Sequence, residues 1–195
     1  MNSFDVVVIG SGPGGYVSAI RCAQLGMKTA IIEKYSTMGG TCLNVGCIPS
    51  KALLDSSHHY EEATKNFSNH GINIEGGISL DFGKMISRKN EVVSQTTKGI
   101  DFLMNKNNIT VFNGFGSFVD QNKVKITLDS SEEIIESKNI IIATGSKPAI
   151  LPFAKVDKDR IITSTEALKL KEIPKHLIII GCLLYTSDAA DEIVR

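Results

Sequence analysis

Residues 4–15 of this chain read Phe4-Asp5-Val6-Val7-Val8-Ile9-Gly10-Ser11-Gly12-Pro13-Gly14-Gly15. The β-branched run at the start predicts a short buried strand. The glycines at positions 10, 12 and 15 form the pattern G-x-G-x-x-G. In a dinucleotide-binding fold the first glycine permits a tight turn, the second lets a pyrophosphate approach the backbone, and the third lets a helix pack on the strand. This stretch therefore predicts an α/β fold that begins with a nucleotide-binding turn.

The segments that follow have the order that such a fold requires. Residues 17–25 have helical spacing and stop at Gly26, and residues 29–32 predict a second strand that ends at Glu33. An acidic residue about 20 residues beyond the turn can accept hydrogen bonds from a ribose diol, and its charge repels a 2′-phosphate. The helix N-terminus offers free N–H groups to the phosphates. We therefore expect a dinucleotide site, and the alternative is a glycine turn without a ligand.

Composition and charge exclude several classes of protein. The chain has 195 residues, with 21 basic and 21 acidic side chains and a formal charge of zero, and it has no block of Lys and Arg for a nucleic acid. No apolar run approaches the roughly 20 residues of a membrane span. Because Met1 leads almost directly into the first strand, we expect no leader peptide and a cytoplasmic protein. Nucleic acids and membranes are not expected partners.

Two of the four cysteines, Cys42 and Cys47, lie close together beyond the second predicted strand. Without an export signal, such a pair is more typical of redox chemistry or metal binding than of a structural disulfide. In a regular helix their Cα atoms would lie about 8–9 Å apart, whereas a disulfide tolerates roughly 4.4–6.8 Å. A bridge therefore requires irregular backbone, which Asn44 and Gly46 tolerate. Pro49 suits the start of the helix that follows.

Zinc binding and inert burial are the alternatives for this pair. Zinc normally takes four ligands with a second close pair, and no matching spacing is present among the histidines, which are His58, His59, His70 and His176. We therefore expect no metal site, whereas inert cysteines stay possible on spacing alone. The first two histidines lie in a predicted helix at residues 48–66, and we assign them no catalytic role.

A family resemblance is carried by residues 39–51, which read Gly39-Gly40-Thr41-Cys42-Leu43-Asn44-Val45-Gly46-Cys47-Ile48-Pro49-Ser50-Lys51. This segment resembles the redox-disulfide signature of the flavin-dependent disulfide reductases, and among them it is most similar to the dihydrolipoyl dehydrogenases. Glutathione and large thioredoxin reductases usually have Lys at the position of Ser50, whereas mercuric reductase shares this serine. The resemblance implies an α/β fold with a Rossmann-like FAD-binding domain, in which a parallel sheet with helices carries a small antiparallel β-meander, truncated relative to the family.

The resemblance also implies roles for individual residues. The catalytic residues are Cys42, which exchanges with a substrate dithiol, and Cys47, which faces the flavin. A substrate thiol must lose its proton before it attacks a disulfide, because only a thiolate is the nucleophile. In the family a His–Glu pair serves as the acid–base for this step, and this sequence has no counterpart of that pair. The expected contacts of FAD are Gly10, Gly12, Gly14, Gly15, Glu33, Gly40, Thr41, Lys51, Gly116, Thr144, Gly145 and Ser146.

The remaining pattern predicts a long helix followed by strands. Residues 81–107 have the spacing of an amphipathic helix. Beyond it we expect short antiparallel strands at 109–112, 123–128 and 133–135, a buried strand at 139–143, and a short helix at 164–170 capped by Ser164 or Thr165.

Residues 175–181 resemble the strand that opens the NAD-binding domain of the family. The family would continue with two more glycines, but Leu183 and Thr186 occupy those positions. We therefore expect three parts, namely an incomplete FAD-binding domain at 1–176, the first strand of a truncated NAD-binding domain at 177–181, and an anomalous tail at 182–195.

For the intact parent, the resemblance implies oxidation of protein-bound dihydrolipoamide, with electrons passing through the disulfide and FAD to NAD. The implied partners are the lipoyl domains of 2-oxoacid dehydrogenase complexes or the glycine cleavage carrier, and a second copy in a homodimer. We expect the 195-residue chain to be inactive alone. The alternatives are another flavin disulfide reductase, of the mercuric or glutathione type, and a non-catalytic FAD-binding fragment.

Overall fold

The computed structural model describes residues 2–128 and 131–180 and is built on a six-stranded sheet in the order β3-β2-β1-β6-β5-β4. Four strands pair in parallel, namely β1 (Ser3–Ile9), β2 (Thr29–Glu33), β3 (Thr110–Asn113) and β6 (Glu132–Ile142). The antiparallel part adds β4 (Phe115–Phe118) and β5 (Lys123–Thr127) beside β6. This arrangement is the expected α/β sheet with a small meander.

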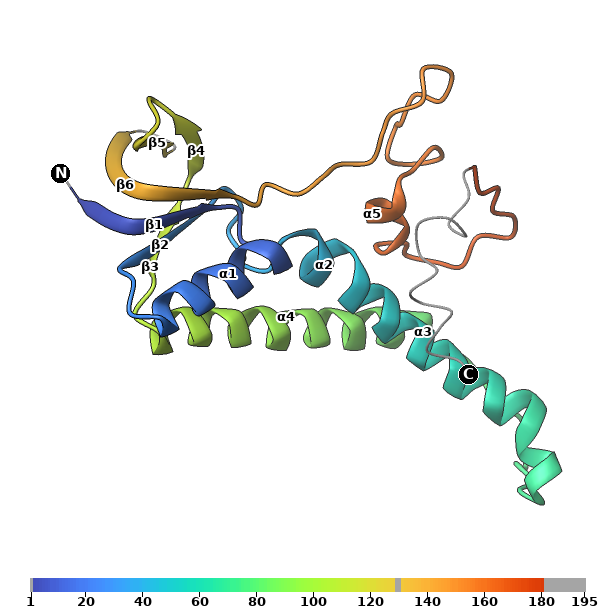
Figure 1. Ribbon diagram of the computed structural model, residues 1–195. Helices are drawn as coiled ribbons and strands as arrows, with labels where there is room; N and C mark the ends of the chain where they lie inside the picture. Colours follow the sequence, from blue (N-terminus) through green and yellow to red (C-terminus); the bar gives the residue numbers. More distant parts are fainter. Residues whose placement is uncertain (1, 129–130, 181–195) are drawn as a thin grey trace.

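Two helices, α1 (Pro13–Gln24) and α4 (Phe82–Lys106), lie along one face of the parallel strands (Figure 1). The helices α2 (Gly40–Val45) and α3 (Cys47–Glu61) extend away from the sheet and pack against α4, and a single turn, α5 (Ser164–Ala167), follows much later. A π-helical turn, η1 (Glu62–Asn66), and a 3-10 turn, η2 (Phe67–His70), extend α3. No helix among the described residues is both long and apolar enough to cross a bilayer.

The alternation of side chains along β1 gives the sheet two cores. Val6 and Val8 point toward α1 and α4, where they are buried in one apolar cluster. Val7 and Ile9 belong to a second cluster with side chains of β5 and β6. Because both faces of β1 are covered, the strand is apolar without interruption. Each fully buried Val or Ile contributes roughly 1.5–3 kcal/mol relative to an exposed one.

Two strand predictions were wrong in pairing or extent. The segment predicted as an antiparallel strand at 109–112 is β3, which pairs parallel with β2 because α4 returns the chain to the same end of the sheet. The strands predicted at 133–135 and 139–143 form the single strand β6. The polar residues between them interrupt the hydrophobic pattern, but Lys138 is paired with Asp5 at 2.7 Å and does not interrupt the strand.

The strand expected at 177–181 is absent in its described part. Residues 177–180 are exposed and pair with no described strand. Apolar β-branched residues do not form a strand alone, because its N–H and C=O groups need a neighbouring strand. Gly181 and the anomalous tail lie outside the described residues, and the expected domain boundaries stay a prediction.

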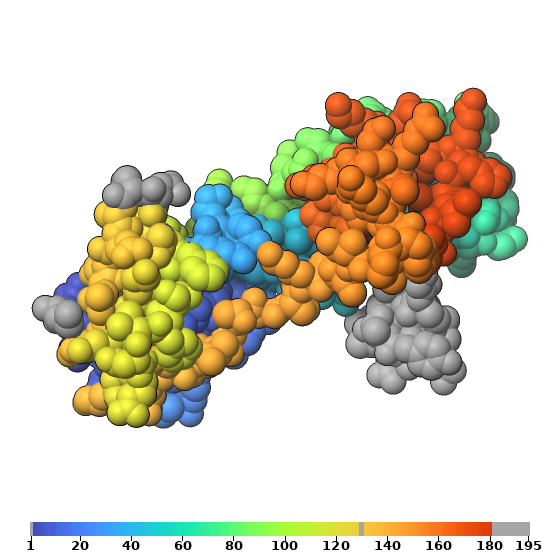
Figure 2. Space-filling view, turned by 90° about the horizontal axis from the view of Figure 1, so that it is seen from above, coloured from blue at the N-terminus to red at the C-terminus, as the bar shows by residue number. Residues whose placement is uncertain are grey.

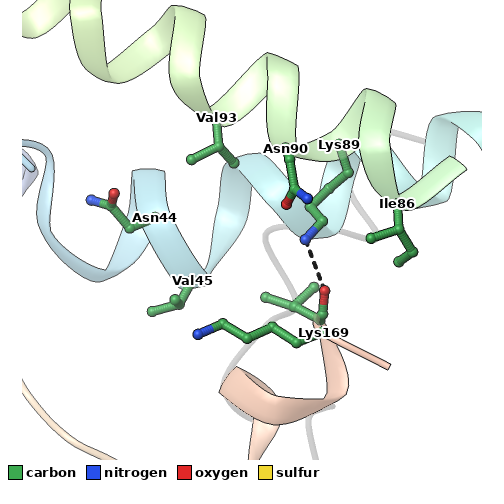
Figure 3. A pocket seen from close by; sticks show the side chains of 8 residues that line it. Asn44, Val45, Ile86, Lys89, Asn90, Val93 and Lys169 are labelled. Carbon is green, nitrogen blue, oxygen red and sulfur yellow. Dashed lines mark hydrogen bonds between the residues drawn. The ribbon is translucent and has the colours of Figure 1, made fainter. Parts of the chain in front are cut away.

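The chain beyond β6 forms a lobe of its own, shown in orange and red in Figure 2. Its short helix α5 begins after Thr163, which forms a capping box with Glu166, so the cap is Thr163 rather than the expected Ser164 or Thr165. Lys89 of α4 is buried, and its Nζ donates a hydrogen bond of 2.9 Å to the carbonyl of Leu168 (Figure 3). Within the described residues, no other hydrogen bond or ion pair joins residues 144–180 to the rest.

A cavity of about 330 Å³ lies beside this contact (Figure 3). Its walls come from α2, α4 and the residues after α5, and they are Asn44, Val45, Ile86, Lys89, Asn90, Val93, Leu168 and Lys169. Burial lowers the pKa of Lys89, and the charge of Lys169 lowers it further. Among the described residues, the one hydrogen bond between the lobe and the body of the protein therefore comes from a lysine that is bonded to a carbonyl rather than to a carboxylate.

Replacing Lys89 with Met should release the lobe, because Met keeps the apolar stem and removes the donor. A hydrogen bond from a charged group contributes about 1.5–3 kcal/mol, so tryptic cleavage within residues 147–160 should become roughly tenfold faster. Lys84→Met, at an exposed position of the same helix, is the control. Equal cleavage rates for Lys89→Met and the unmodified chain would contradict the proposed anchoring.

Candidate functional site

The turn between β1 and α1 is packed backbone against backbone. Gly10 has a φ of +101°, and a Cβ atom at this position would lie 2.3 Å from the carbonyl oxygen of Ala143 at the end of β6. A Cβ atom on Gly15 would lie 1.8 Å from the carbonyl oxygen of Gly10. Both positions therefore exclude a side chain. The close packing of helix on strand expected from the motif is present.

The first turn of α1 is open, in contrast to this packing. Gly12 is the N-cap and provides no side chain to bond the helix N–H groups, Pro13 follows at N1, and no acidic residue lies in the first turn. A Cβ atom on Gly14 would meet no atom within 4 Å. The N-terminus of this twelve-residue helix has free N–H groups with space in front of them. Such a terminus is suited to bind a phosphate group.

Glu33 lies at the end of β2, as expected, and its carboxylate is held by three donors. The Oε2 atom accepts hydrogen bonds from the backbone N–H of Ser11 at 2.9 Å and from its Oγ at 2.5 Å. The Oε1 atom accepts one from the N–H of Tyr35 at 3.0 Å. An ionised carboxylate has about four acceptor positions, so one position remains for a ligand. Sequence reasoning missed Ser11, which occupies a variable position of the glycine motif.

The helix that carries the first cysteine begins against the glycine turn. Gly40, the first residue of α2, has a φ of +60°, and a Cβ atom there would lie 2.6 Å from Cα of Gly12. Thr41 is exposed beside it. The structure therefore brings the glycine turn and the beginning of the cysteine segment into direct contact, although Gly12 and Gly40 lie 28 positions apart in the sequence.

The two cysteines lie on different helices, because Gly46 interrupts the backbone between α2 and α3 with φ −140° and ψ −120°. Cys42 is half-buried in α2, Cys47 is the exposed first residue of α3, and both are free thiols. The expected irregular backbone is therefore confirmed at Gly46, and Pro49 lies in the first turn of α3 as expected. The disulfide itself stays a prediction.

The expected role of Asn44 was wrong. Its backbone is helical, and its side chain holds the segment together instead. Nδ2 donates to the carbonyl oxygens of Met38 at 3.0 Å and Gly40 at 2.9 Å, and Oδ1 accepts a hydrogen bond from Thr37. The amide ties α2 to the loop before it, a contact for which single-sequence patterns give no signal.

The electrostatic surroundings of Cys42 favour its neutral thiol. Burial raises the pKa of this thiol, and the side chain of Cys47 raises it further through a hydrogen bond and its charge. The backbone of Cys47 and, to a smaller extent, the charge of Lys51 lower the pKa. Cys47 and Lys51 are therefore both close enough to influence the thiol that the resemblance assigns to exchange. The Cys42 thiol must lose its proton before it can attack a disulfide, because only a thiolate does so.

The other expected cofactor contacts are only partly brought together. Thr144 lies two residues beyond the end of β6, and its Cα would lie 3.2 Å from a Cβ on Gly10. Gly145 and Ser146 follow it and are exposed. Gly116 lies in β4 and faces Ile9, whose Cγ2 would be 3.2 Å from an added Cβ. Apolar side chains enclose Gly116 and leave little room for a larger residue, so packing alone accounts for a glycine at this position. The role of Gly116 and residues 144–146 in binding a cofactor stays a prediction.

Metal ligands do not gather among the described residues, where no group of three or more His, Cys, Asp or Glu side chains is close enough to hold an ion. His58 and His59 lie together on α3, and His59 is 3.7 Å from Asp55 on the same helix. This contact is that of an ordinary exposed helix face.

The domain combines a parallel sheet and an open glycine turn with a carboxylate at the end of the second strand and an adjoining pair of cysteines. Together these features define a dinucleotide-binding domain of redox type. The chain belongs to the pyridine nucleotide-disulphide oxidoreductase family, whose model matches residues 4–183. This match confirms the expected family and fold class. Members of the family depend on FAD and use NAD(P), so the expected cofactor class is confirmed for the family.

Individual relatives agree with this assignment. The chain is 48% identical over 181 residues to dihydrolipoyl dehydrogenase of Trypanosoma brucei brucei, covering 92% of this chain and 38% of the relative. It is 53% identical over 178 residues to the mitochondrial dihydrolipoyl dehydrogenase of Dictyostelium discoideum, covering 91% and 36%. Among solved structures, the Cu(II) complex of the HOCl-induced flavoprotein disulfide reductase RclA from Escherichia coli superposes with a TM-score of 0.75 at 29% identity, covering 89% and 36%. The chain thus spans little more than a third of the relatives it matches.

Replacing Gly40 with Ala should separate α2 from the glycine turn. The added methyl group meets backbone, which cannot yield cheaply, so we expect a loss of about 1–3 kcal/mol in the free energy of unfolding beyond the cost of a positive φ. Gly77→Ala is the matched control, since Gly77 has a φ of +80° but no atom within 4 Å of an added Cβ. Urea unfolding measures both variants, and equal losses would show that the contact contributes nothing.

Replacing Lys51 with Met should raise the pKa of Cys42, because the substitution removes the nearby positive charge that favours the thiolate. The pH profile of Cys42 alkylation in the reduced chain should therefore move to higher pH. Lys98→Met, on the exposed face of α4, should leave the profile in place. A profile that does not move in the Lys51 variant would remove this lysine from the surroundings of the thiol.

Proposed function

We propose that this chain binds FAD and carries the redox-active cysteine pair of a dihydrolipoyl dehydrogenase. The contact between Gly12 and Gly40 is the observation that carries the proposal, because it joins the phosphate-binding turn to the helix of Cys42. The identities of 48% and 53% to dihydrolipoyl dehydrogenases, against 29% to the other disulfide reductase, favour this member of the family. A mercuric or glutathione type of reductase is the alternative.

The residues present fit FAD. The pyrophosphate would be held at the open first turn of α1, where Gly12 and Gly14 leave space, and the adenosine ribose would take the remaining acceptor position of Glu33. Thr41 and Lys51 would lie along the rest of the molecule, with Gly116 and residues 144–146 completing the site. When bound, FAD supplies the two-electron acceptor that links a dithiol to NAD.

The cysteines would perform the exchange with a dithiol substrate. In the oxidised protein, a substrate thiolate attacks the sulfur of Cys42, which forms a mixed disulfide and releases Cys47 as a thiolate. The second substrate thiolate then displaces Cys42, so that the substrate leaves as a disulfide and both cysteines are reduced. In the chain alone Cys47 is more exposed than Cys42. A cofactor that covers Cys47 would leave Cys42 as the accessible sulfur, as the family resemblance implies.

Partners and compartment follow from the same proposal. The intact protein would oxidise dihydrolipoamide on the lipoyl domains of 2-oxoacid dehydrogenase complexes or on the glycine cleavage carrier, and it would act as a homodimer. A cytoplasmic location stays a prediction, since the relatives include mitochondrial enzymes.

Titration of the purified chain with FAD tests the cofactor assignment. We expect saturable binding with a shifted flavin spectrum, and a dissociation constant roughly tenfold or more higher for Glu33→Gln, which removes a charge-assisted hydrogen bond to the ribose. Glu75→Gln, at an exposed position, is the control. The absence of binding by the unmodified chain would refute the assignment.

The redox assignment is tested in the intact protein. Cys42→Ser and Cys47→Ser should each abolish lipoamide-dependent reduction of NAD while FAD stays bound, because neither variant can form the disulfide. Cys22→Ser, in α1, should retain activity. A near-normal rate in either of the first two variants would eliminate the disulfide as the site of exchange.

A further inference from the structure

Ser11 is fully buried, and its hydroxyl group joins two parts of the site. The hydroxyl donates to Oε2 of Glu33 at 2.5 Å and accepts a hydrogen bond from the N–H of Gly39 at 3.2 Å. The same N–H also reaches the carbonyl oxygen of Ser11 at 3.0 Å. One side chain therefore contacts both the carboxylate at the end of β2 and the residue that precedes α2.

The first effect of this contact is on the carboxylate. Glu33 is only 5% exposed, so its charge is removed from most of the surrounding water. Burying a carboxylate is costly unless donors replace the water, and Ser11 supplies two of the three donors observed. The hydroxyl therefore fixes the direction in which the free acceptor position of Glu33 points.

The second effect is on the helix of the first cysteine. Gly39 is the N-cap of α2 and has no side chain with which to bond the first turn. Its own N–H is held by the hydroxyl and carbonyl of Ser11, and three residues later the helix presents Cys42. The start of α2 is thus attached to the same serine that orients Glu33.

We propose that Ser11 is a positioning residue that couples the ribose-binding carboxylate of Glu33 to the placement of Cys42. The coupling deepens the proposed function and rests on it. In a protein that binds FAD, it would make the adenosine end of the cofactor site depend on how the cysteine segment is arranged. The physical link is a chain of two hydrogen bonds through one hydroxyl, and Ser11→Ala removes both of them while leaving the backbone N–H and carbonyl in place.

The coupling can be measured without a cofactor. The chain has four cysteines, so Cys22→Ser, Cys47→Ser and Cys182→Ser together leave Cys42 as the only thiol. In this background, Ser11→Ala should raise the rate of Cys42 alkylation by iodoacetamide roughly three- to tenfold, as expected for the loss of an ordinary hydrogen bond. Ser18→Ala is the matched control, because the Ser18 hydroxyl bonds only carbonyls within α1.

A double-mutant cycle separates coupling from general loosening. Glu33→Gln should also raise the alkylation rate of Cys42, and the double variant with Ser11→Ala should react about as fast as either single variant, since both remove the same chain of contacts. Multiplicative effects, or a rate in Ser11→Ala equal to that of Ser18→Ala, would overturn the proposal. Circular dichroism confirms that each variant is folded, and Glu33→Gln still tests the coupling if Ser11→Ala is not.

A separate arm uses the cofactor. FAD should bind to Ser11→Ala with a dissociation constant three- to tenfold higher than to the unmodified chain, and unchanged or tighter binding would overturn the proposal. If the unmodified chain binds no FAD at all, the proposed function fails, and the alkylation cycle alone decides whether Ser11 couples Glu33 to Cys42.

Discussion

Contact between backbones at the carboxyl edge of the sheet is the constraint on which this structure depends. At Gly10, Gly15 and Gly40, a single added carbon atom would meet another backbone segment at well under 3 Å. Only glycine permits the end of β6, the start of α1 and the start of α2 to approach so closely. The site exists because these three segments, distant in the sequence, are packed without side chains between them.

The polar groups of the site follow from this packing. Once α2 begins against the glycine turn, the carboxylate of Glu33 is enclosed and must be given donors, which Ser11 and Tyr35 provide. Cys42 is half-buried against the apolar cluster between β1, α1 and α4. This burial raises the pKa of its thiol, while the charge of Lys51 counteracts the rise. The packing of α2 therefore affects how readily this sulfur ionises.

Much of the fold could be predicted from the sequence, because periodicity reports directly on burial. The apolar run of β1, the glycine turn, α1 and the long helix α4 were identified from their patterns, and so was the break at Gly46. The errors share a cause. Parallel pairing of β3, the continuity of β6 through Lys138 and the absence of a strand at 177–180 all depend on which segment lies alongside, and a linear pattern contains no information about neighbours.

The sequence by itself determined the dinucleotide motif, the acid at the end of the second strand and the presence of two cysteines at a spacing that regular structure cannot bridge. These are statements about residue type and distance along the chain, which backbone geometry translates directly into local structure. Only the tertiary structure decided that Ser11 bonds both Glu33 and Gly39, that Asn44 acts through its side chain, and that Lys89 is joined to Leu168. Hydrogen bonds between segments are decided in this way because each donor is satisfied by whatever acceptor the packed fold brings within about 3 Å of it.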